Sequence, residues 1–378
     1  MAISTFGFPT AIHFGPGARA LVADHLRERG VSRPLIVTDR ALSKLPVLAE
    51  FRRRLDDGFA CAVFDGVFGN PTAVQVMAGA AAFRAHGADA VIGFGGGAAL
   101  DVAKAVAMMA VHEGDVLDYA WDASPPRPLQ HALPHFVALP TTAGTGSEVG
   151  RSSVISEDAS HLKRVIFSPA LLAKAVFADP ELTLDLPPEV TAATGMDALT
   201  HNVESYLSPM YHPMCDGIAL EGTRLAARSL QRAVQQPRDL QARSDMMMAS
   251  MMGAVAFQKD LGAVHACAHA LGAVAGLHHG LANALMIDTV LAWNLEAEPR
   301  KFDELSHAAG VGGGGRAFVP WLAQLKRQIG LDGGLASRGV TREQVPRLVQ
   351  VAHADICHRT NPRPVTEADF ERLFLQAM

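Results

Sequence analysis

Histidines and one aspartate in the second half of the chain have the residue types and spacing of a metal site. Asp197 and His201 are four residues apart, and so are His265 and His269. On a helix, residues four apart lie on the same face, so each pair can converge on one point. Four of the 16 histidines fall within residues 261–280, where even spreading would place about one. This clustering in an apolar segment requires an explanation.

Metal binding explains the clustering, because buried imidazoles need partners and an imidazole set with one carboxylate suits Fe²⁺ or Zn²⁺. The sequence does not choose between these two metals. Spacing also does not separate His278 from His279 as a further ligand. The alternative is that these histidines cap helices or complete hydrogen bonds in the core.

A glycine-rich turn in the first half of the chain has the pattern of a phosphate-binding site. Residues 91–104, VIGFGGGAALDVAK, read as a strand, a glycine turn and the start of a helix. Glycines let the backbone approach a ligand closely, and a helix start presents unpaired N–H groups with a positive dipole end. The pattern is neither G-x-G-x-x-G nor a P-loop. A tight structural turn is the alternative interpretation.

Two further polar positions follow predicted strands. The loop at residues 140–148, PTTAGTGSE, offers hydroxyl groups and open backbone, and Asp39 ends the strand Val37-Thr38-Asp39. Loops at the carboxyl ends of parallel strands line the ligand crevice of such sheets. An acid at Asp39 can accept a hydrogen bond from a ribose 2′-hydroxyl and repel a 2′-phosphate, which favours NAD over NADP. A helix-capping or turn role for Asp39 is equally open.

The elements around these motifs predict an α/β domain followed by a helical domain. Short continuous apolar runs alternate with amphipathic segments in the first half, which is typical of a parallel, Rossmann-like sheet covered on both faces. The predicted strands are residues 35–38, 61–64, 90–94, 136–139 and 176–178. After about residue 185 the strand pattern fades and Ala-, Leu- and Met-rich segments follow. We therefore expect a dinucleotide-binding α/β domain at 1–185 and an all-α metal-binding domain at 186–378.

Composition excludes several classes of function. The formal net charge is −5 with no basic block, which argues against nucleic acid or an anionic membrane surface as a partner. No uncharged apolar run reaches the roughly 18 residues that a membrane span needs. The four cysteines are scattered, and the N-terminus lacks a secretory pattern. These features predict a protein of a reducing compartment, the cytoplasm.

Taken in this order, the motifs resemble the iron-containing alcohol dehydrogenase family over nearly the whole chain. The segments that carry the resemblance are the glycine turn with Asp101-Val102-Ala103-Lys104, the loop at 140–148, Asp179-Pro180-Glu181-Leu182-Thr183, the segment 195–201, His265 to His269, the segment 279–284 and Asn361-Pro362-Arg363.

The resemblance implies an NAD(P)-dependent enzyme that moves a hydride between nicotinamide and a small alcohol or aldehyde, with a divalent metal as Lewis acid. It assigns the metal, Fe²⁺ or alternatively Zn²⁺, to Asp197, His201, His265 and His279. It places His269 beside the metal, where it could relay the alcohol proton, although a packing role is equally open. The cofactor contacts it implies are Gly96, Gly97, Ala98, Thr141, Thr142 and Thr145, with Asn70 and Lys163 placed less securely. It also suggests a homodimer or larger assembly.

Three positions depart from the family pattern. Ala98 stands where relatives often have Ser, so one hydroxyl contact is lost while the backbone N–H remains. Ala270 replaces a common Pro after His269. Asp260 stands where relatives often carry Gly, in a segment expected near the substrate pocket, so substrate identity does not carry over by analogy.

Three rival interpretations remain at this point. A sugar-phosphate cyclase of the dehydroquinate-synthase kind would share the cofactor domain and the metal, but would need basic residues around a phosphate-bearing substrate. A non-redox metallohydrolase would not need the glycine turn. A catalytically inactive binding protein would not need an intact ligand set. Which alcohol or aldehyde is the substrate lies beyond the sequence.

Overall fold

The computed structural model describes residues 6–8, 10–55, 58–159 and 162–378. These residues divide into two compact units. The first, which we call the α/β unit, holds the described residues of 8–142 and 147–183. The second, the helical unit, holds residues 6–7, 143–146 and 184–378.

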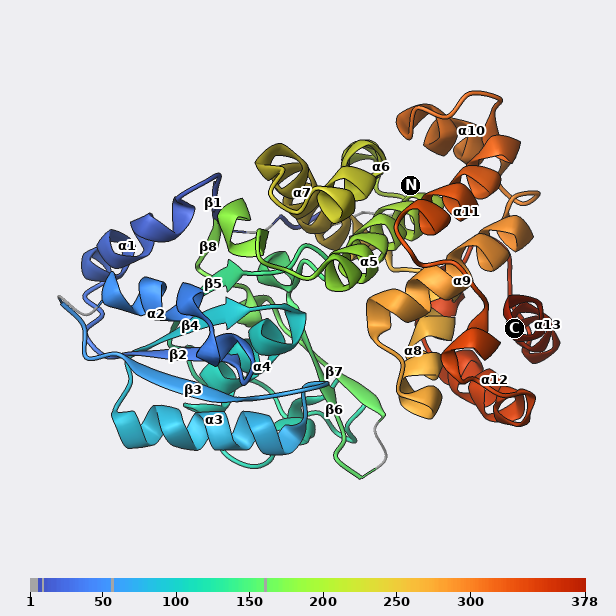
Figure 1. Ribbon diagram of the computed structural model, residues 1–378. Coiled ribbons are helices and arrows are strands. Elements are labelled where there is room, and N and C mark those ends of the chain that lie inside the picture. The colour runs from blue at the N-terminus through green and yellow to red at the C-terminus, as the bar shows by residue number, and fades with distance from the viewer. Residues whose placement is uncertain (1–5, 9, 56–57, 160–161) are drawn as a thin grey trace. The chain divides into compact units, whose positions relative to one another are not determined.

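The α/β unit is built on a sheet whose six described strands all pair in parallel (Figure 1). Their spatial order is β1-β8-β5-β4-β2-β3. The bounds are β1 (Ala11–Phe14), β2 (Pro34–Asp39), β3 (Ala62–Val67), β4 (Ala90–Gly95), β5 (His135–Pro140) and β8 (Ala175–Ala178). The five strands predicted from apolar runs are confirmed. The edge strand β1 was not predicted, because its four residues are largely exposed and form no continuous apolar run.

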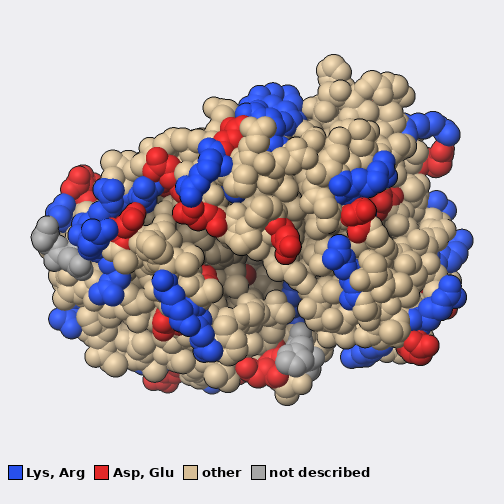
Figure 2. All heavy atoms as spheres, in the orientation of Figure 1, with Lys and Arg blue, Asp and Glu red and all other residues tan. Residues whose placement is uncertain are grey.

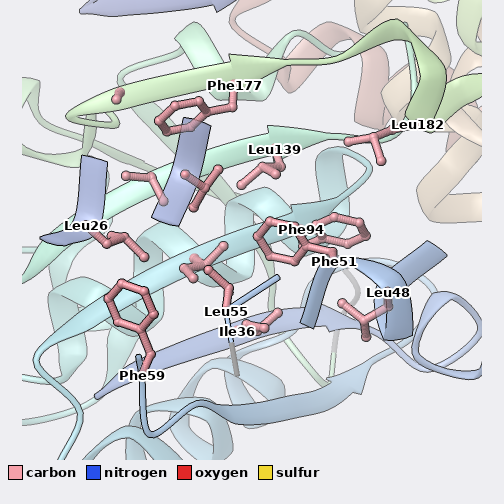
Figure 3. Close-up of a cluster of buried hydrophobic side chains, with 14 residues drawn as sticks. Leu26, Ile36, Leu48, Phe51, Leu55, Phe59, Phe94, Leu139, Phe177 and Leu182 are labelled. Atoms are coloured by element: carbon pink, nitrogen blue, oxygen red, sulfur yellow. The ribbon is translucent and has the colours of Figure 1, made fainter. Parts of the chain in front are cut away.

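Four helices cover the two faces of this sheet (Figure 1). The helices α1 (Val22–Glu28) and α2 (Pro46–Arg53) lie on one face, and α3 (Ala73–His86) and α4 (Gly97–Met109) lie on the other. The core between the sheet and the first pair is drawn in Figure 3, where Phe51 of α2 stacks on Phe94 of β4 with ring centroids 5.0 Å apart. The strands β2, β4, β5 and β8 are buried on both faces, so they read as continuous apolar runs.

A buried polar network fixes α4 against the loop and the hairpin that follow it. The antiparallel hairpin consists of β6 (Ser152–Ser156) and β7 (Lys163–Phe167). Lys104 donates to Ser147 Oγ at 2.8 Å and to the Ser152 carbonyl at 2.7 Å. Asp101 accepts from Ser147 Oγ at 2.6 Å and from the Val154 N–H at 3.1 Å. The motif Asp101-Val102-Ala103-Lys104 therefore anchors α4, the helix that begins at the glycine turn, to Ser147 and to the hairpin.

The helical unit contains nine described α-helices and no described strand (Figure 1). They are α5 (Pro188–Leu207), α6 (Pro213–Gln235), α7 (Leu240–Ala256), α8 (Ala263–Ala275), α9 (His279–Asn294), α10 (Pro299–Ala308), α11 (Phe318–Gln328), α12 (Val345–Ala354) and α13 (Glu367–Ala377). A parallel sheet in the first part and helices in the second confirm the predicted fold class. The helix α5 packs against α6, α7 and α9, which places it at the centre of this unit.

The described surface bears charges of both signs. Figure 2 shows Lys and Arg side chains interspersed with Asp and Glu over the face it presents. Within the described ranges, no helix is both long enough and apolar enough to span a membrane.

The network around Lys104 predicts a large loss of stability when its charge is removed. Lys104→Met leaves the buried Asp101 carboxylate without its cation, so we expect the free energy of unfolding of the α/β unit to fall by about 3–5 kcal/mol. Thermal unfolding followed by fluorescence checks this expectation. Arg27→Met is the control, because the Arg27–Asp24 ion pair is exposed and should contribute about 0–1 kcal/mol. Equal melting temperatures for the two variants would contradict the prediction.

Glu148 predicts a pH-dependent stability in the same unit. Burial raises the pKa of this carboxyl from 4.5 to about 7. Between these values the unfolded chain releases the proton while the folded chain keeps it, so stability falls as pH rises and stays lowered above about 7. At pH 8 the free energy of unfolding of Glu148→Gln should therefore exceed that of the wild type by up to about 3 kcal/mol, with a higher melting temperature. At pH 4 the two proteins should be equally stable. The exposed Glu50→Gln is the control, and a gain that does not depend on pH would argue against this account.

Candidate metal centre and cofactor-binding turn

The helix α5 places three acid and imidazole side chains on one buried face. Asp197, His201 and Glu204 follow one another at spacings of four and three residues and are almost fully buried. Such spacing aligns side chains along one side of a helix. Asp197 and His201 were predicted from their spacing. Glu204 was not predicted: its position seven residues after Asp197 places it on the same helix face, but its partner His265 lies 61 residues away in sequence.

The helices α8 and α9 bring two further histidines to this face. His265 lies in the first turn of α8, and His279 is the first residue of α9. The backbone of α9 can approach α5 closely because the next residue is Gly280. A Cβ atom there would lie 2.2 Å from the Ala193 carbonyl oxygen. The pair His279-Gly280 thus combines a metal-type side chain with the close approach that positions it.

The four predicted ligands come together around one oxygen atom. Asp197 Oδ1 lies 3.4 Å from His279 Nε2, 3.8 Å from His265 Nε2 and 4.0 Å from His201 Nδ1. The ring of His201 also stacks on that of His265 with centroids 4.6 Å apart. Asp197, His265 and His279 each offer a ligand atom within 4.8 Å of the others. This geometry matches a shared cation.

The electrostatics of the cluster fit a divalent cation. Burial alone would raise the pKa of Asp197, but the surrounding histidines hold it well below its usual range, so the carboxylate is charged. Burial lowers the pKa of His201 to about 4, which keeps this imidazole neutral as a ligand must be. Its Nδ1 has no hydrogen-bond partner among the described residues. An acid with three imidazoles is a donor set for iron or zinc.

Glu204 orients His265 from the opposite side. Glu204 Oε2 lies 2.6 Å from His265 Nδ1, and the same carboxylate accepts from the backbone N–H of Val264 at 2.7 Å. A ring that donates from Nδ1 presents the lone pair of Nε2 to an ion. Burial disfavours a charged His265, yet its hydrogen bonds to Asp197 and Glu204 outweigh this and raise its pKa to about 9, so with no cation bound Nε2 carries a proton that a metal ion would displace. The carboxylates of Asp197 and Glu204 thus favour a positive charge at His265.

Asn283 of α9 supports the same conclusion. Its Nδ2 donates to Asp197 Oδ1 at 2.7 Å and lies 3.4 Å from the Nε2 atoms of His265 and His279. The partly positive amide therefore points to where the donor atoms converge. Sequence analysis included Asn283 in a family segment without giving it a role.

His269 lies one helical turn after His265 and outside the set around Asp197 Oδ1. Its ring stacks on that of His279, with centroids 5.3 Å apart and planes 18° apart. Its Nδ1 lies 2.7 Å from Asp355 Oδ2. Asp355 follows α12 and was not predicted, because nothing in its local sequence points to α8.

In the α/β unit, the predicted glycine turn joins β4 to α4. Gly95 has φ of +156°, and a Cβ atom there would meet that of Ala99 at 2.6 Å, so the turn needs glycine. Gly96 is the N-cap of α4 and lies against Thr142, whose side chain a Cβ would meet at 3.1 Å. The 13-residue helix α4 then begins at Gly97 and presents its first N–H groups and positive dipole end.

A pocket of about 480 Å³ opens beside this turn. It is lined by Asp39, Arg40, Ala41, Lys44, Val67, Phe68, Gly69, Gly96, Ala98 and Ala99. Asp39 Oδ1 accepts from the N–H groups of Ala41 and Leu42 at 3.0 and 2.8 Å, so the residue does cap the turn after β2. It also lines the pocket, and the two interpretations of Asp39 are therefore compatible.

The other predicted cofactor contacts are spread along the α/β unit. Thr141 is buried, and its N–H donates to the Gly95 carbonyl at 3.0 Å. Asn70 is exposed, two residues before Thr72, which bridges to Ser156, the register partner of Lys163. Asn70 and Lys163 therefore come to one region, but neither lines the 480 Å³ pocket. Thr145 belongs to the helical unit.

Comparison with known proteins places this geometry in a family. The profile described as iron-containing alcohol dehydrogenase matches residues 9–180, and the profile for the C-terminal part of that family matches residues 191–378. The chain is 39% identical over 381 aligned residues to a 4-hydroxybutyrate dehydrogenase of Cupriavidus necator, which covers 98% of each protein.

Solved structures agree with these matches. A 1,3-propanediol oxidoreductase has a TM-score of 0.94 at 36% identity and covers 99% of this chain and 100% of its own. A sulfoacetaldehyde reductase from Bifidobacterium kashiwanohense, solved in complex with NAD⁺, has a TM-score of 0.92 at 29% identity, with coverage of 100% and 99%. The chain therefore belongs to the iron-containing alcohol dehydrogenase family and is an NAD(P)-dependent oxidoreductase.

Proposed function

We propose that Asp197, His201, His265 and His279 hold one Fe²⁺ ion and that the chain oxidises or reduces a small alcohol or aldehyde there. The observation that carries this proposal is the convergence of three imidazoles on the buried Asp197 carboxylate within 3.4–4.0 Å. Zn²⁺ suits the same ligands, and the family favours iron. In this proposal the domain expected at residues 186–378 binds the metal, and the domain expected at residues 1–185 binds the dinucleotide.

The chemistry divides between the bound groups and the side chains of the chain. When bound, the cation polarises the substrate oxygen and NAD exchanges the hydride. Asp197 balances the positive charge, and Glu204 keeps the His265 ring in the orientation that a ligand needs. His269 accepts the hydroxyl proton at Nε2 during oxidation and returns it during reduction.

We propose that the glycine turn holds the pyrophosphate of NAD through the backbone of Gly96, Gly97 and Ala98. The N-terminus of α4 and the adjoining pocket support this assignment. Thr141, Thr142, Thr145, Asn70 and Lys163 are the further contacts. Asp39 favours NAD over NADP because it would repel a 2′-phosphate. Arg40 lines the same pocket, but its guanidinium already lies 4.2 Å from the ring centre of Phe68.

We also infer a homodimer in the cytoplasm. Four free cysteines suit a reducing compartment. Strand β1 is an edge strand with exposed Ile12 and Phe14 side chains, which is a surface that a second copy could cover.

His265→Ala provides the test of the metal assignment. We expect loss of the bound ion and a fall in turnover of at least about 1,000-fold, because the remaining ligands no longer complete the site. Metal content by mass spectrometry and NADH formation from a panel of alcohols, after reconstitution with Fe²⁺ or Zn²⁺, are the measurements. His112→Ala is the matched control, because this buried histidine lies in the α/β unit and should keep both metal and turnover.

Near-normal turnover in metal-free His265→Ala would refute the metal role. The same panel separates the rivals of the oxidoreductase. A cyclase would return NAD unchanged without net NADH, and a metallohydrolase would not bind NAD.

Asp260 supports a preference for uncharged substrates within this proposal. The residue follows Phe257–Lys259, and Phe257 packs on the ring of His201 with centroids 5.3 Å apart. Burial first, and then Asp355, Glu204 and Asp260, raise the pKa of the Cys357 thiol, whose Sγ lies within 4.8 Å of ligand atoms of His269 and Asp355. The backbone of Asp260 has φ of 60° and ψ of −175°, a region that glycine favours, so an acid is held there against strain. We propose that this carboxylate repels substrates that themselves carry a carboxylate.

Asp260→Asn removes the charge and keeps the shape of the side chain. We expect kcat/KM for 4-hydroxybutyrate to rise about 5- to 10-fold relative to 1,3-propanediol, because a repulsion of about 1 kcal/mol is removed. The gain should shrink as ionic strength increases. Asp332→Asn, an exposed acid elsewhere in the helical unit, is the control. An unchanged ratio of the two substrates would show that Asp260 does not face the substrate.

A further inference from the structure

The carboxylate of Asp355 joins His269 to the backbone that follows α12. Asp355 Oδ2 lies 2.7 Å from His269 Nδ1, and Asp355 Oδ1 accepts from the N–H of Cys357 at 2.8 Å. Both oxygens are therefore engaged, one by the imidazole and one by the main chain. The side chains of His269 and Asp355 are 22% and 18% exposed, so water competes only weakly for this contact.

Two contacts restrict the ring of His269, the hydrogen bond to Asp355 and the stacking on His279. A carboxylate only accepts hydrogen bonds when charged, and the interaction with His269 together with the Cys357 N–H holds the pKa of Asp355 well below its usual range despite burial. Asp355 Oδ2 lies 2.7 Å from Nδ1 and a carboxylate oxygen accepts, so Nδ1 of His269 carries the hydrogen of this contact, and in a neutral ring the lone pair lies on Nε2. Stacking against His279, at 18° between planes, restricts rotation of the ring.

The neighbouring thiol does not compete for this role. Burial and the charge of Asp355 raise the pKa of the Cys357 thiol well above its usual value, so the group stays protonated when no metal ion is bound. The packing of α12 against α8 brings Asp355 to His269 across 86 residues of sequence. The acid and the imidazole form a pair built by tertiary structure.

We propose that Asp355 is a positioning residue of the enzyme, which holds His269 in the Nδ1–H tautomer and aims its Nε2 at the substrate hydroxyl. This inference rests on the proposed function of the metal centre and of His269. In this role Asp355 touches neither substrate nor metal. It acts through His269 in the way that carboxylates orient ligand and catalytic histidines elsewhere.

A double-mutant cycle tests whether Asp355 acts through His269. We expect Asp355→Ala to lower kcat about 10- to 100-fold with little change in KM or in bound metal. Once His269→Ala is present, adding Asp355→Ala should cause no further loss. Asp355→Glu should restore part of the activity, because it returns a carboxylate. Asp245→Asn is the control: this carboxylate is buried in the same unit against Arg228 and Ser229, and its loss should lower stability without lowering kcat.

The tautomer supplies a readout that does not depend on activity. In zinc-loaded protein labelled with ¹⁵N-histidine, the His269 signals, assigned by their absence in His269→Ala, should show a protonated Nδ1 and an unprotonated Nε2. Asp355→Ala should shift this ring toward the Nε2–H tautomer.

Three results would overturn the proposal. The first is an Asp355→Ala loss that adds fully to that of His269→Ala. The second is an unchanged tautomer in Asp355→Ala. The third is two metal ions per chain falling to one in Cys357→Ser, since His269, Asp355 and Cys357 would then bind a second cation. The proposed function fails on different evidence, the metal content and turnover of the wild type and of His265→Ala.

Discussion

A buried carboxylate surrounded by imidazoles is the constraint on which the helical unit depends. Asp197 is removed from water, and a buried charge is tolerated only where partners compensate it. Those partners come from three helices, because α5, α8 and α9 each supply imidazoles to the same oxygen. The close approach at Gly280, the carboxylate of Glu204 and the amide of Asn283 all maintain this arrangement. Packing and chemistry therefore impose the same requirement on these helices.

The α/β unit meets a different requirement, which is to present open backbone without losing rigidity. Glycines at 95 and 96 leave room that side chains would fill, and such residues weaken a turn because they cost conformational entropy on folding. The buried pair of Lys104 and Asp101 offsets this by tying α4 to Ser147 and to the hairpin β6–β7. Ala98 lines the pocket beside the turn and has no hydroxyl group, so it presents only its backbone and a methyl group there.

The metal-ligand set and the residue Asp260 contrast in how well each fits its surroundings. All four expected ligands are present and converge, whereas Asp260 introduces an acid into a backbone conformation suited to glycine. Strained residues of this kind persist where the surrounding structure holds them in place and are common at functional sites. The similar proteins include a 4-hydroxybutyrate dehydrogenase, a 1,3-propanediol oxidoreductase and a sulfoacetaldehyde reductase, so substrates differ among relatives of one fold.

Local spacing was enough to predict much of this protein, and tertiary packing decided the rest. The strands around Ile36, Ile92 and Val137 were readable because doubly buried strands are continuously apolar, and Asp197 with His201 because helical spacing is local. The exposed strand β1 gave no such pattern. Two roles depend on long-range contacts instead. Glu204 orients His265, which lies 61 residues away in sequence, and Asp355 is the partner of His269, which lies 86 residues away. Such contacts follow from how whole helices pack, which no short pattern encodes.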